Sequence, residues 1–376
     1  MRCNGILLLF IFILVFNSSF AEDLPVIHVS KKRPEVKAKM SVFFDSVRYV
    51  PLETTDVCLL GLGTMGVNQI GDSLLVWDSD NCFLFDSKTG KFLRKIGHRG
   101  DDPESFRMTY GNFYNPYDNL IYFFGDYNSL VCYDLNGEFV GKIKIPMSSN
   151  WSSSKCVIPL DSTMFCAFFS NCNGSESKRI ILFDKSGRIV KIYPNYHFVK
   201  TNQFVYDSND GLFYRYNNHV YFREKFIDTV YQVNKELLLP MRRLDFSPYI
   251  SSYRDRYNID VNSISFPYSI FENDHIIMFD YFREIFHELG VYDKKTSNIS
   301  FFSYENGFED DLNYFMPIEI LAMLENGICL SILSASNICK YIDGMNVELQ
   351  GCMKCLESVS EDDNPVVVIA MLRKYR

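Results

Sequence analysis

Short apolar runs alternate with polar turn segments along the chain, and the same arrangement returns several times. The first clear copy places apolar runs at residues 74–77 and 82–86, then a turn that ends at Gly90, then a third run at 92–97. Runs of four to six apolar residues between turn residues are typical of strands, and they are too short for ordinary helices. We therefore predict strands in each copy, with its second and third runs joined as a hairpin.

Two further copies repeat the pattern and share the chemistry of the turn. Asp134 opens one turn and Gly137 closes it three residues later, and Asp184 and Gly187 do the same in the next copy. An aspartate side chain can accept hydrogen bonds from the backbone of the turn, and glycine tolerates the backbone conformation that follows. The shared turn marks equivalent positions of one repeating unit.

The turn marker recurs at a nearly constant interval. Its positions are Asp86, Asp134, Asp184, Asn234 and Asp293, spaced by 48, 50, 50 and 59 residues. A sixth unit is predicted to begin near residue 328 and to reach the matching sequence Tyr341-Ile342-Asp343. A repeat of this length with three or four strands is that of a propeller blade, so we predict an all-β fold, a six-bladed β-propeller over residues 41–376.

The two ends of this region offer strands that could close the ring. Residues 42–52 and 365–372 both have strand-like sequences, and one or both are expected to complete the last blade. Between them, Leu349, Cys352, Met353 and Leu356 fall at helical spacing, which predicts a short C-terminal helix within 346–360 that packs on the ring.

The N-terminus has the layout of a secretory signal peptide. Arg2 precedes eleven apolar residues at 6–16, and Ser19-Phe20-Ala21 supplies small residues before a cleavage point. Eleven residues are too few to cross a bilayer, and no second long apolar run follows. We predict a signal peptide at 1–21, an N-terminal extension at 22–40, no membrane span after cleavage, and export to the periplasm or cell surface.

Composition and charge narrow the partners and the redox chemistry. The 33 Phe and 24 Tyr favour strands, and a net charge of −8 argues against nucleic acid or anionic lipid as a partner. Several of the 11 cysteines lie inside apolar runs, where they are expected to be small core residues: Cys82, Cys132, Cys166 and Cys329. Cys352 and Cys355 form a Cys-x-x-Cys pair for which a packing role is favoured over a redox or metal role.

Three segments resemble a known family. Residues 96–106 (IGHRGDDPESF) resemble the linker between blades in NHL-like propellers, although Asp102, Glu104 and Ser105 replace residues typical of that linker. Residues 48–54 (RYVPLET) and 362–366 (DDNPV) resemble the terminal signatures of the exported six-bladed propeller family common in Bacteroidales bacteria. The resemblance implies a fold and an extracytoplasmic location, and it implies no reaction.

Motifs for catalysis or cofactor binding are mostly missing. Residues 61–66 match Gly-x-Gly-x-x-Gly, but a glycine at position 71 leaves no room for the helix that would face a pyrophosphate, so we predict a turn and no cofactor. None of the six histidines pair at metal spacing, and no metal site is predicted. The alternative is a channel-centred, metal-dependent hydrolase or lyase, because ligands from several blades would be far apart in sequence.

Two groups of residues are candidates for ligand binding. The first group consists of four charged residues close together in one predicted blade linker: Arg99, Asp101, Asp102 and Glu104. This linker is either a solvated connection or a polar recognition loop.

The second group is aromatic. Tyr114 and Tyr117 lie with Tyr110, Phe113, Asn112 and Asn115 in what we predict to be another linker, where they could stack on a sugar or peptide. The favoured function is a non-catalytic binding or scaffold propeller that recognises a protein or glycan in the cell envelope as a monomer. A structural subunit of an envelope complex is the third interpretation.

Overall fold

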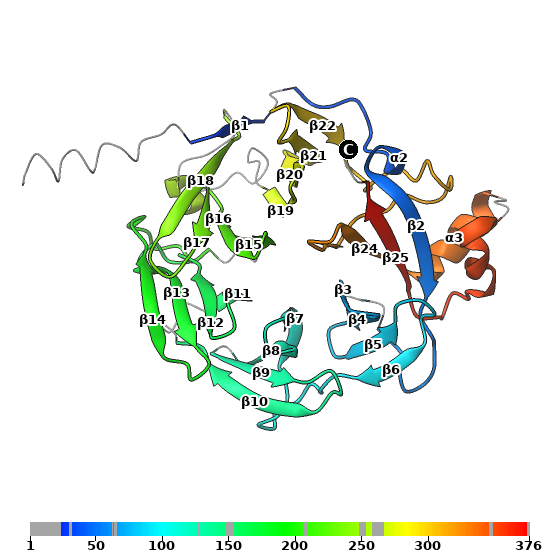
Figure 1. The fold of residues 1–376 in the computed structure, drawn as a ribbon, viewed down its shortest axis with the longest axis horizontal. Coiled ribbons are helices and arrows are strands. Elements are labelled where there is room, and N and C mark those ends of the chain that lie inside the picture. Colours follow the sequence, from blue (N-terminus) through cyan, green and yellow to red (C-terminus); the bar gives the residue numbers. More distant parts are fainter. Residues whose placement is uncertain are drawn as a thin grey trace, which may run out of the picture.

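The computed structural model describes residues 24–29, 32–61, 63, 66–126, 128–146, 154–205, 210–247, 253–257, 267–345 and 349–373. Six sheets surround a common axis, which confirms the six-bladed propeller (Figure 1). The predicted signal peptide at 1–21 lies outside the described residues. Within the part of the chain that is described, no helix has both the length and the apolar character to span a membrane.

Blades 1 to 3 each contain four antiparallel strands, numbered from the axis outward. Blade 1 has β3 (Gly66–Ile70), β4 (Ser73–Trp77), β5 (Cys82–Asp86) and β6 (Phe92–Lys95). Blade 2 has β7 (Met108–Asn115), β8 (Leu120–Asp126), β9 (Ser129–Tyr133) and β10 (Phe139–Lys144). Blade 3 has β11 (Ser154–Pro159), β12 (Met164–Phe169), β13 (Lys178–Asp184) and β14 (Ile189–Pro194). The predicted strands at 74–77 and 82–86 and their hairpins are confirmed.

Blades 4 and 5 follow the same order. Blade 4 has β15 (Gly211–Tyr216), β16 (His219–Glu224), β17 (Thr229–Val233) and β18 (Leu238–Asp245), and the short strand β1 (Val26–His28) adds to its outer edge. A 3₁₀ helix, η1 (Tyr253–Tyr257), lies between the two blades in sequence. Blade 5 has β19 (Pro267–Glu272), β20 (Ile276–Arg283), β21 (Phe286–Asp293) and β22 (Ile299–Ser303).

Blade 6 closes the ring with strands from both ends of the chain. Its order is β23 (Ala322–Met323), β24 (Ile328–Leu333), β25 (Val366–Leu372) and β2 (Phe44–Pro51). β2 pairs with β25 in antiparallel register, with Val47 opposite Ala370. Both strands predicted near the ends of the propeller are therefore confirmed, and together they leave no open end in the ring.

The prediction that the sixth unit reaches a matching marker at residues 341–343 is wrong. Tyr341-Ile342-Asp343 lies in the helix α3 (Ala335–Met345), and the third strand of this blade is β25 instead. A 3₁₀ helix, η3 (Gly351–Ser358), follows α3, and Leu349, Met353 and Leu356 are buried against the ring, which confirms the short C-terminal helix. The sequence at 341–343 matched the marker in residue type, but it belongs to an insertion between the second and third strands of the blade.

In blades 1 to 5 the Oδ1 of the marker residue accepts hydrogen bonds from two backbone N–H groups of the turn that follows it. The Oδ1 of Asp134 accepts from the N–H groups of Asn136 (2.8 Å) and Glu138 (3.0 Å), and Asp184 repeats these bonds with Ser186 and Arg188. Gly137 takes a positive φ of 85°. The sequence pattern therefore reflects a real structural repeat.

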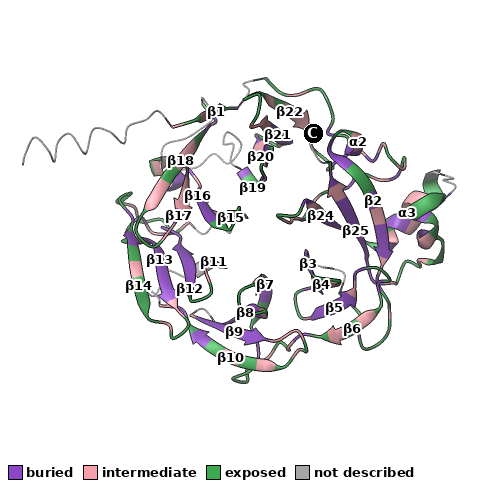
Figure 2. Cartoon of the chain, in the orientation of Figure 1, coloured by how far each residue is buried: buried purple, intermediate pink, exposed green. Residues whose placement is uncertain are grey.

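The apolar core lies between neighbouring blades rather than inside any one of them. Between blades 1 and 2, for example, Leu84 of β5 packs in one cluster with Phe123 of β8 and Tyr133 of β9. The middle strands are buried on both faces, while the turns and outer strands are more exposed (Figure 2). Four cysteines are buried as predicted: Cys82, Cys132, Cys166 and Cys329. Nine cysteines of the described residues are free thiols.

The N-terminal segment runs along the outside of two blades before it enters the sixth (Figure 1). β1 pairs in parallel with β18 of blade 4, where Ile27 is buried. Further on, the N–H of Ser303 at the edge of blade 5 donates to the carbonyl of Val36 (2.8 Å). The short helix α2 (Met40–Phe43) then leads into β2. Residues 24–29 and 32–43 thus cover the outer edges of blades 4 and 5.

This covering segment should contribute to stability. We expect Ile27→Ala to lower the free energy of unfolding by about 2 kcal/mol, the lower end for a buried isoleucine, because a three-residue edge strand can partly relax. Chemical denaturation of the mature chain measures the change. Val36→Ala is the matched control, since Val36 is 62% exposed and should change stability by less than about 0.5 kcal/mol. Equal effects of the two substitutions would contradict the prediction.

Candidate functional site

The linker that joins blade 1 to blade 2 lies at one face of the ring. Because strands alternate in direction, this face carries every linker between blades and every turn between second and third strands, and we call it the linker face. The opposite face, the turn face, carries the turns between first and second strands and those between third and fourth strands. Arg99, Asp101, Asp102 and Glu104 therefore belong to the linker face.

The backbone of this linker is held firmly against the core. Phe106 is fully buried and stacks on Phe123 of β8, with ring centroids 4.6 Å apart. The N–H of Phe106 donates to the carbonyl of His98 (3.0 Å), and the hydroxyl of Tyr133 donates to the carbonyl of Glu104. These contacts fix the loop while its charged side chains point outward, which is the usual design of a binding loop on a rigid scaffold.

The linker and a neighbouring turn enclose a hollow of about 650 Å³, which we call the polar pocket. Its lining consists of polar side chains and one glycine: Asp80, Asn81, Lys95, His98, Arg99, Gly100, Asp101 and Arg107. Asp80 and Asn81 come from the turn between β4 and β5, and the others follow or end β6. The pocket can therefore offer many hydrogen bonds and charges of both signs.

The polar side chains of the pocket are paired with one another. The guanidinium of Arg99 donates to Asp80, Arg107 pairs with Asp101 (3.0 Å), and Lys95 donates to the Oδ1 of Asn81 (2.9 Å). The Arg99 guanidinium holds the pKa of Asp80 below its usual value. These side chains are about half exposed or more, so solvent screens the pairs and they add little to stability. The same groups can exchange partners with a polar ligand.

The predicted charged residues have different places at this site. Arg99 and Asp101 line the pocket. Asp102 does not line the pocket but pairs with His98, which does (2.7 Å), and this hydrogen bond keeps the pKa of Asp102 below its usual value. Glu104 is exposed at the loop and does not line the pocket. Sequence reasoning missed Asp80 and Asn81, because only the folded blade brings their turn against the linker.

Tyr114 and Tyr117 lie on the other side of the ring. The prediction that residues 110–117 form a linker is wrong, because β7 spans Met108–Asn115. Tyr114 is at the end of β7 that reaches the turn face, and its hydroxyl donates to Asn119. Tyr117 follows in the turn and is 40% exposed, with the guanidinium of Arg215 5.5 Å from its ring centroid. These two tyrosines and the polar pocket cannot contact one small ligand together.

The neighbouring aromatic residues serve mainly the core. Phe113 stacks on Tyr122 of β8 with ring centroids 5.2 Å apart, whereas Tyr110 is 50% exposed. The Gly-x-Gly-x-x-Gly sequence ends at Gly66, where the strand β3 begins, in agreement with the predicted absence of a following helix.

Buried ion pairs form a second set of polar groups that sequence reasoning did not find. Three of them join segments that are far apart in sequence: Arg179 with Glu224, Arg242 with Glu272, and Arg256 with Asp210. The fourth, Arg283 with Glu288, lies within the hairpin of β20 and β21. His287 pairs with Asp280 (2.7 Å) and stacks on Phe282. Among the residues that the structure describes, no three His, Cys, Asp or Glu side chains are grouped so that they could hold a metal.

The chain belongs to a protein family whose sequence model it matches over most of its length. Residues 24–371 match the model of the "Domain of unknown function (DUF4934)". No curated protein matches the sequence.

Two solved structures resemble the fold closely enough to compare. A "Putative exported protein" from Bacteroides fragilis NCTC 9343 is 18% identical, with a TM-score of 0.71 over 93% of this chain and 100% of that one. A member of the DUF4221 family from Bacteroides vulgatus ATCC 8482 is 10% identical, with a TM-score of 0.51 over 91% of this chain and 99% of that one. At these identities the likeness concerns the fold.

Proposed function

We propose that this member of the DUF4934 family is an exported, non-catalytic binding propeller that recognises a protein or glycan of the bacterial cell envelope. The polar pocket on the linker face is the proposed recognition site, with Arg99 and Asp101 in direct contact with the ligand. Asp102 acts through His98, and Glu104 lies at the border of the loop.

The observation that carries this proposal is the contrast between a fixed backbone and exposed, mutually paired charges. The buried Phe106 anchors the linker, while Arg99 and Arg107 stand in solvent with weak partners. Ligand carboxylates or hydroxyls can replace those partners with little cost in free energy, because exposed pairs are worth about 0–1 kcal/mol each. A rigid loop also loses little conformational entropy when a ligand binds.

The proposal predicts that binding depends on the arginines of the pocket. The purified mature chain is tested on arrays of bacterial polysaccharides and of envelope-protein peptides. For any ligand so identified, we expect the double substitution Arg99→Ala and Arg107→Ala to weaken binding tenfold or more, which corresponds to about 1.4 kcal/mol. Calorimetric titration measures the dissociation constants.

Arg188→Ala with Lys88→Ala is the matched control. It also removes two exposed, paired cations, but both belong to hairpin turns on the turn face. Retained affinity after the loss of Arg99 and Arg107, or an equal loss in the control, would contradict the site. A stoichiometric metal in the purified chain, together with a lower melting temperature after chelation, would contradict the non-catalytic assignment.

A further inference from the structure

Blade 6 carries an insertion that the propeller itself does not need. Residues 334–365 separate β24 from β25, whereas the equivalent turns of blades 1 and 4 are the short segments 78–81 and 225–228. The insertion starts on the linker face and forms α3 and η3, which lie outside the ring beside β2 and β25 (Figure 1). It presents a surface that the other blades lack.

This insertion is strongly acidic. Residues 334–364 contain six Asp and Glu and two Lys, a net charge of −4, whereas the whole chain carries −8. Half of the net charge is therefore concentrated in a small part of the chain. Such a local excess favours encounter with a basic partner.

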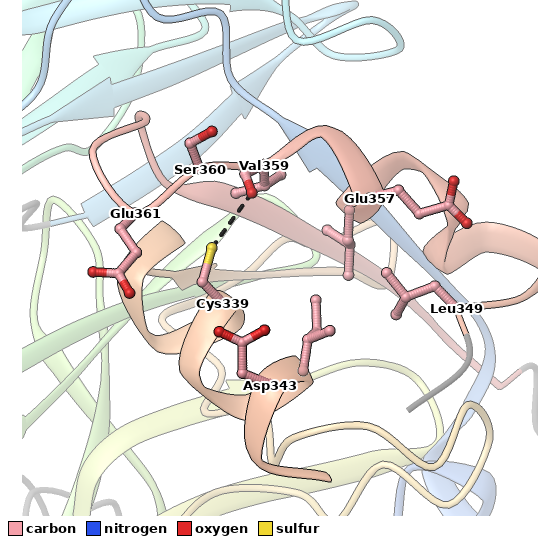
Figure 3. Close-up of a pocket in the computed structure, with 9 residues that line it drawn as sticks. Cys339, Asp343, Leu349, Glu357, Val359, Ser360 and Glu361 are labelled. Atoms are coloured by element: carbon pink, nitrogen blue, oxygen red, sulfur yellow. Dashed lines mark hydrogen bonds between the residues drawn. The ribbon is translucent and has the colours of Figure 1, made fainter. Parts of the chain in front are cut away.

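The helices of the insertion enclose a hollow of about 560 Å³, which we call the acidic hollow (Figure 3). Ile342 and Val359 are half-buried on its lining, next to the buried Leu349 and Leu356. The Sγ of Cys339 donates to the carbonyl of Val359 (3.4 Å) and so ties α3 to the segment that leads to β25. This side of the hollow is apolar and held in place.

Carboxylates surround the apolar lining. Asp343 of α3, Glu357 of η3 and Glu361 all line the hollow. No ion pair within the described ranges uses any of these three carboxylates. Burial, together with the charges of Glu361 and Asp343, raises the pKa of the Cys339 thiol. The hollow is therefore a site of negative potential whose lining combines carboxylates with apolar side chains.

We propose that the acidic hollow docks a basic segment of a partner protein. The side chains of lysine and arginine combine an apolar stem with a cationic head. This matches a lining that combines apolar side chains with carboxylates that form no ion pair within the described chain. The stem packs on Ile342 and Val359, and the head pairs with Asp343, Glu357 or Glu361. This surface is distinct from the polar pocket and does not depend on the function proposed for it.

The test uses a labelled peptide of alternating lysine and leucine and the full mature chain. We expect the peptide to bind, and we expect the triple variant Asp343→Asn, Glu357→Gln, Glu361→Gln to bind it tenfold more weakly or worse. The control triple variant, Glu138→Gln, Glu236→Gln, Glu325→Gln, changes the net charge equally at exposed acids away from the insertion, and should keep the affinity within twofold. Fluorescence anisotropy measures binding, and circular dichroism confirms that both variants fold.

Several outcomes would overturn the proposal. These are no binding of the peptide, an equal loss in both triple variants, or equal affinity for a peptide with serine in place of leucine. Spermidine that displaces the peptide at equal concentration would assign the hollow to a small cation instead. Sedimentation measures whether the wild-type chain self-associates. If it does, and the first triple variant does not, the acidic hollow binds a second copy of the chain instead.

Discussion

Replacing Glu272 by alanine is expected to destabilise the ring by about 3–5 kcal/mol, because it removes the shared partner of a buried polar network. The carboxylate of Glu272 is fully buried at the end of β19. It accepts two hydrogen bonds from the guanidinium of Arg242 (2.7 and 2.8 Å), one from the hydroxyl of Tyr214 (2.9 Å), and it pairs with Lys294 (2.7 Å).

The network joins two blades, so its loss should affect the whole ring. Arg242 and Tyr214 belong to blade 4, whereas Glu272 and Lys294 belong to blade 5. Without the carboxylate, the mostly buried guanidinium of Arg242 loses its counter-charge and both of its strong hydrogen bonds. A buried cation without a partner costs far more than the pair contributed when intact.

Chemical denaturation of the mature chain measures the change in the free energy of unfolding. Two further variants test whether the loss of the buried carboxylate causes it. Glu272→Gln keeps an acceptor oxygen of similar shape and should lose less than Glu272→Ala. Glu309→Ala removes a half-exposed acid whose lysine partners are 4.0 Å away, and it should change the free energy of unfolding by less than about 0.5 kcal/mol. A Glu272→Ala variant as stable as Glu309→Ala would show that the network does not hold the blades together.

The two middle strands of most blades could be predicted because both of their faces are buried. In β5 the residues Cys82 to Phe85 are all buried between neighbouring blades, so the strand appears in the sequence as a continuous apolar run. The hairpin turn after it is marked by Asp86, whose Oδ1 accepts from two backbone N–H groups. Burial and turn chemistry are both local signals, and both are visible in one sequence.

The innermost strands were not predicted, because they face the axis and lack that signal. β7 contains Gly111, which has a φ of 82°, and Asn112, and its register with β8 shifts between Met108 and Phe113. The polar and glycine residues that permit this irregular strand are the same ones that made it look like a linker. The position of Tyr114 was therefore predicted wrongly.

The polar groups that meet in space could be predicted only in part. The charges of the linker at 99–104 were recognisable, because they are close together in sequence. Asp80, which pairs with Arg99, comes from another turn, and the buried pair of Arg179 and Glu224 joins two blades. These contacts depend on which blades and turns lie side by side, and a single sequence does not contain that information.

The second large effect is expected for Gly90→Ala, which should lower the free energy of unfolding by about 2–4 kcal/mol through left-handed backbone strain and overpacking. Gly90 has a φ of 72°, and a Cβ atom there would lie 1.9 Å from the carbonyl oxygen of Pro51. Pro51 ends β2, the outer strand of blade 6, so the turn of blade 1 rests directly on the strand that closes the ring. At Gly137 and Gly187 an added Cβ would likewise meet the preceding blade, 2.3 and 2.6 Å from the carbonyl oxygens of Lys95 and Lys144.

Two control glycines separate the strain from the clash. Gly71 has a φ of 58°, but an added Cβ there would have no atom within 4 Å, so Gly71→Ala should show only the backbone strain, about 1–2 kcal/mol. Gly141 has neither a positive φ nor a close neighbour, so alanine there should be nearly neutral. Chemical denaturation measures the loss in the free energy of unfolding for each of the three variants. The excess of the loss for Gly90→Ala over that for Gly71→Ala is the contribution of the contact between blades. If that excess is zero, the turn can move away from Pro51 freely, and the glycine of the repeated turn is required by backbone conformation alone.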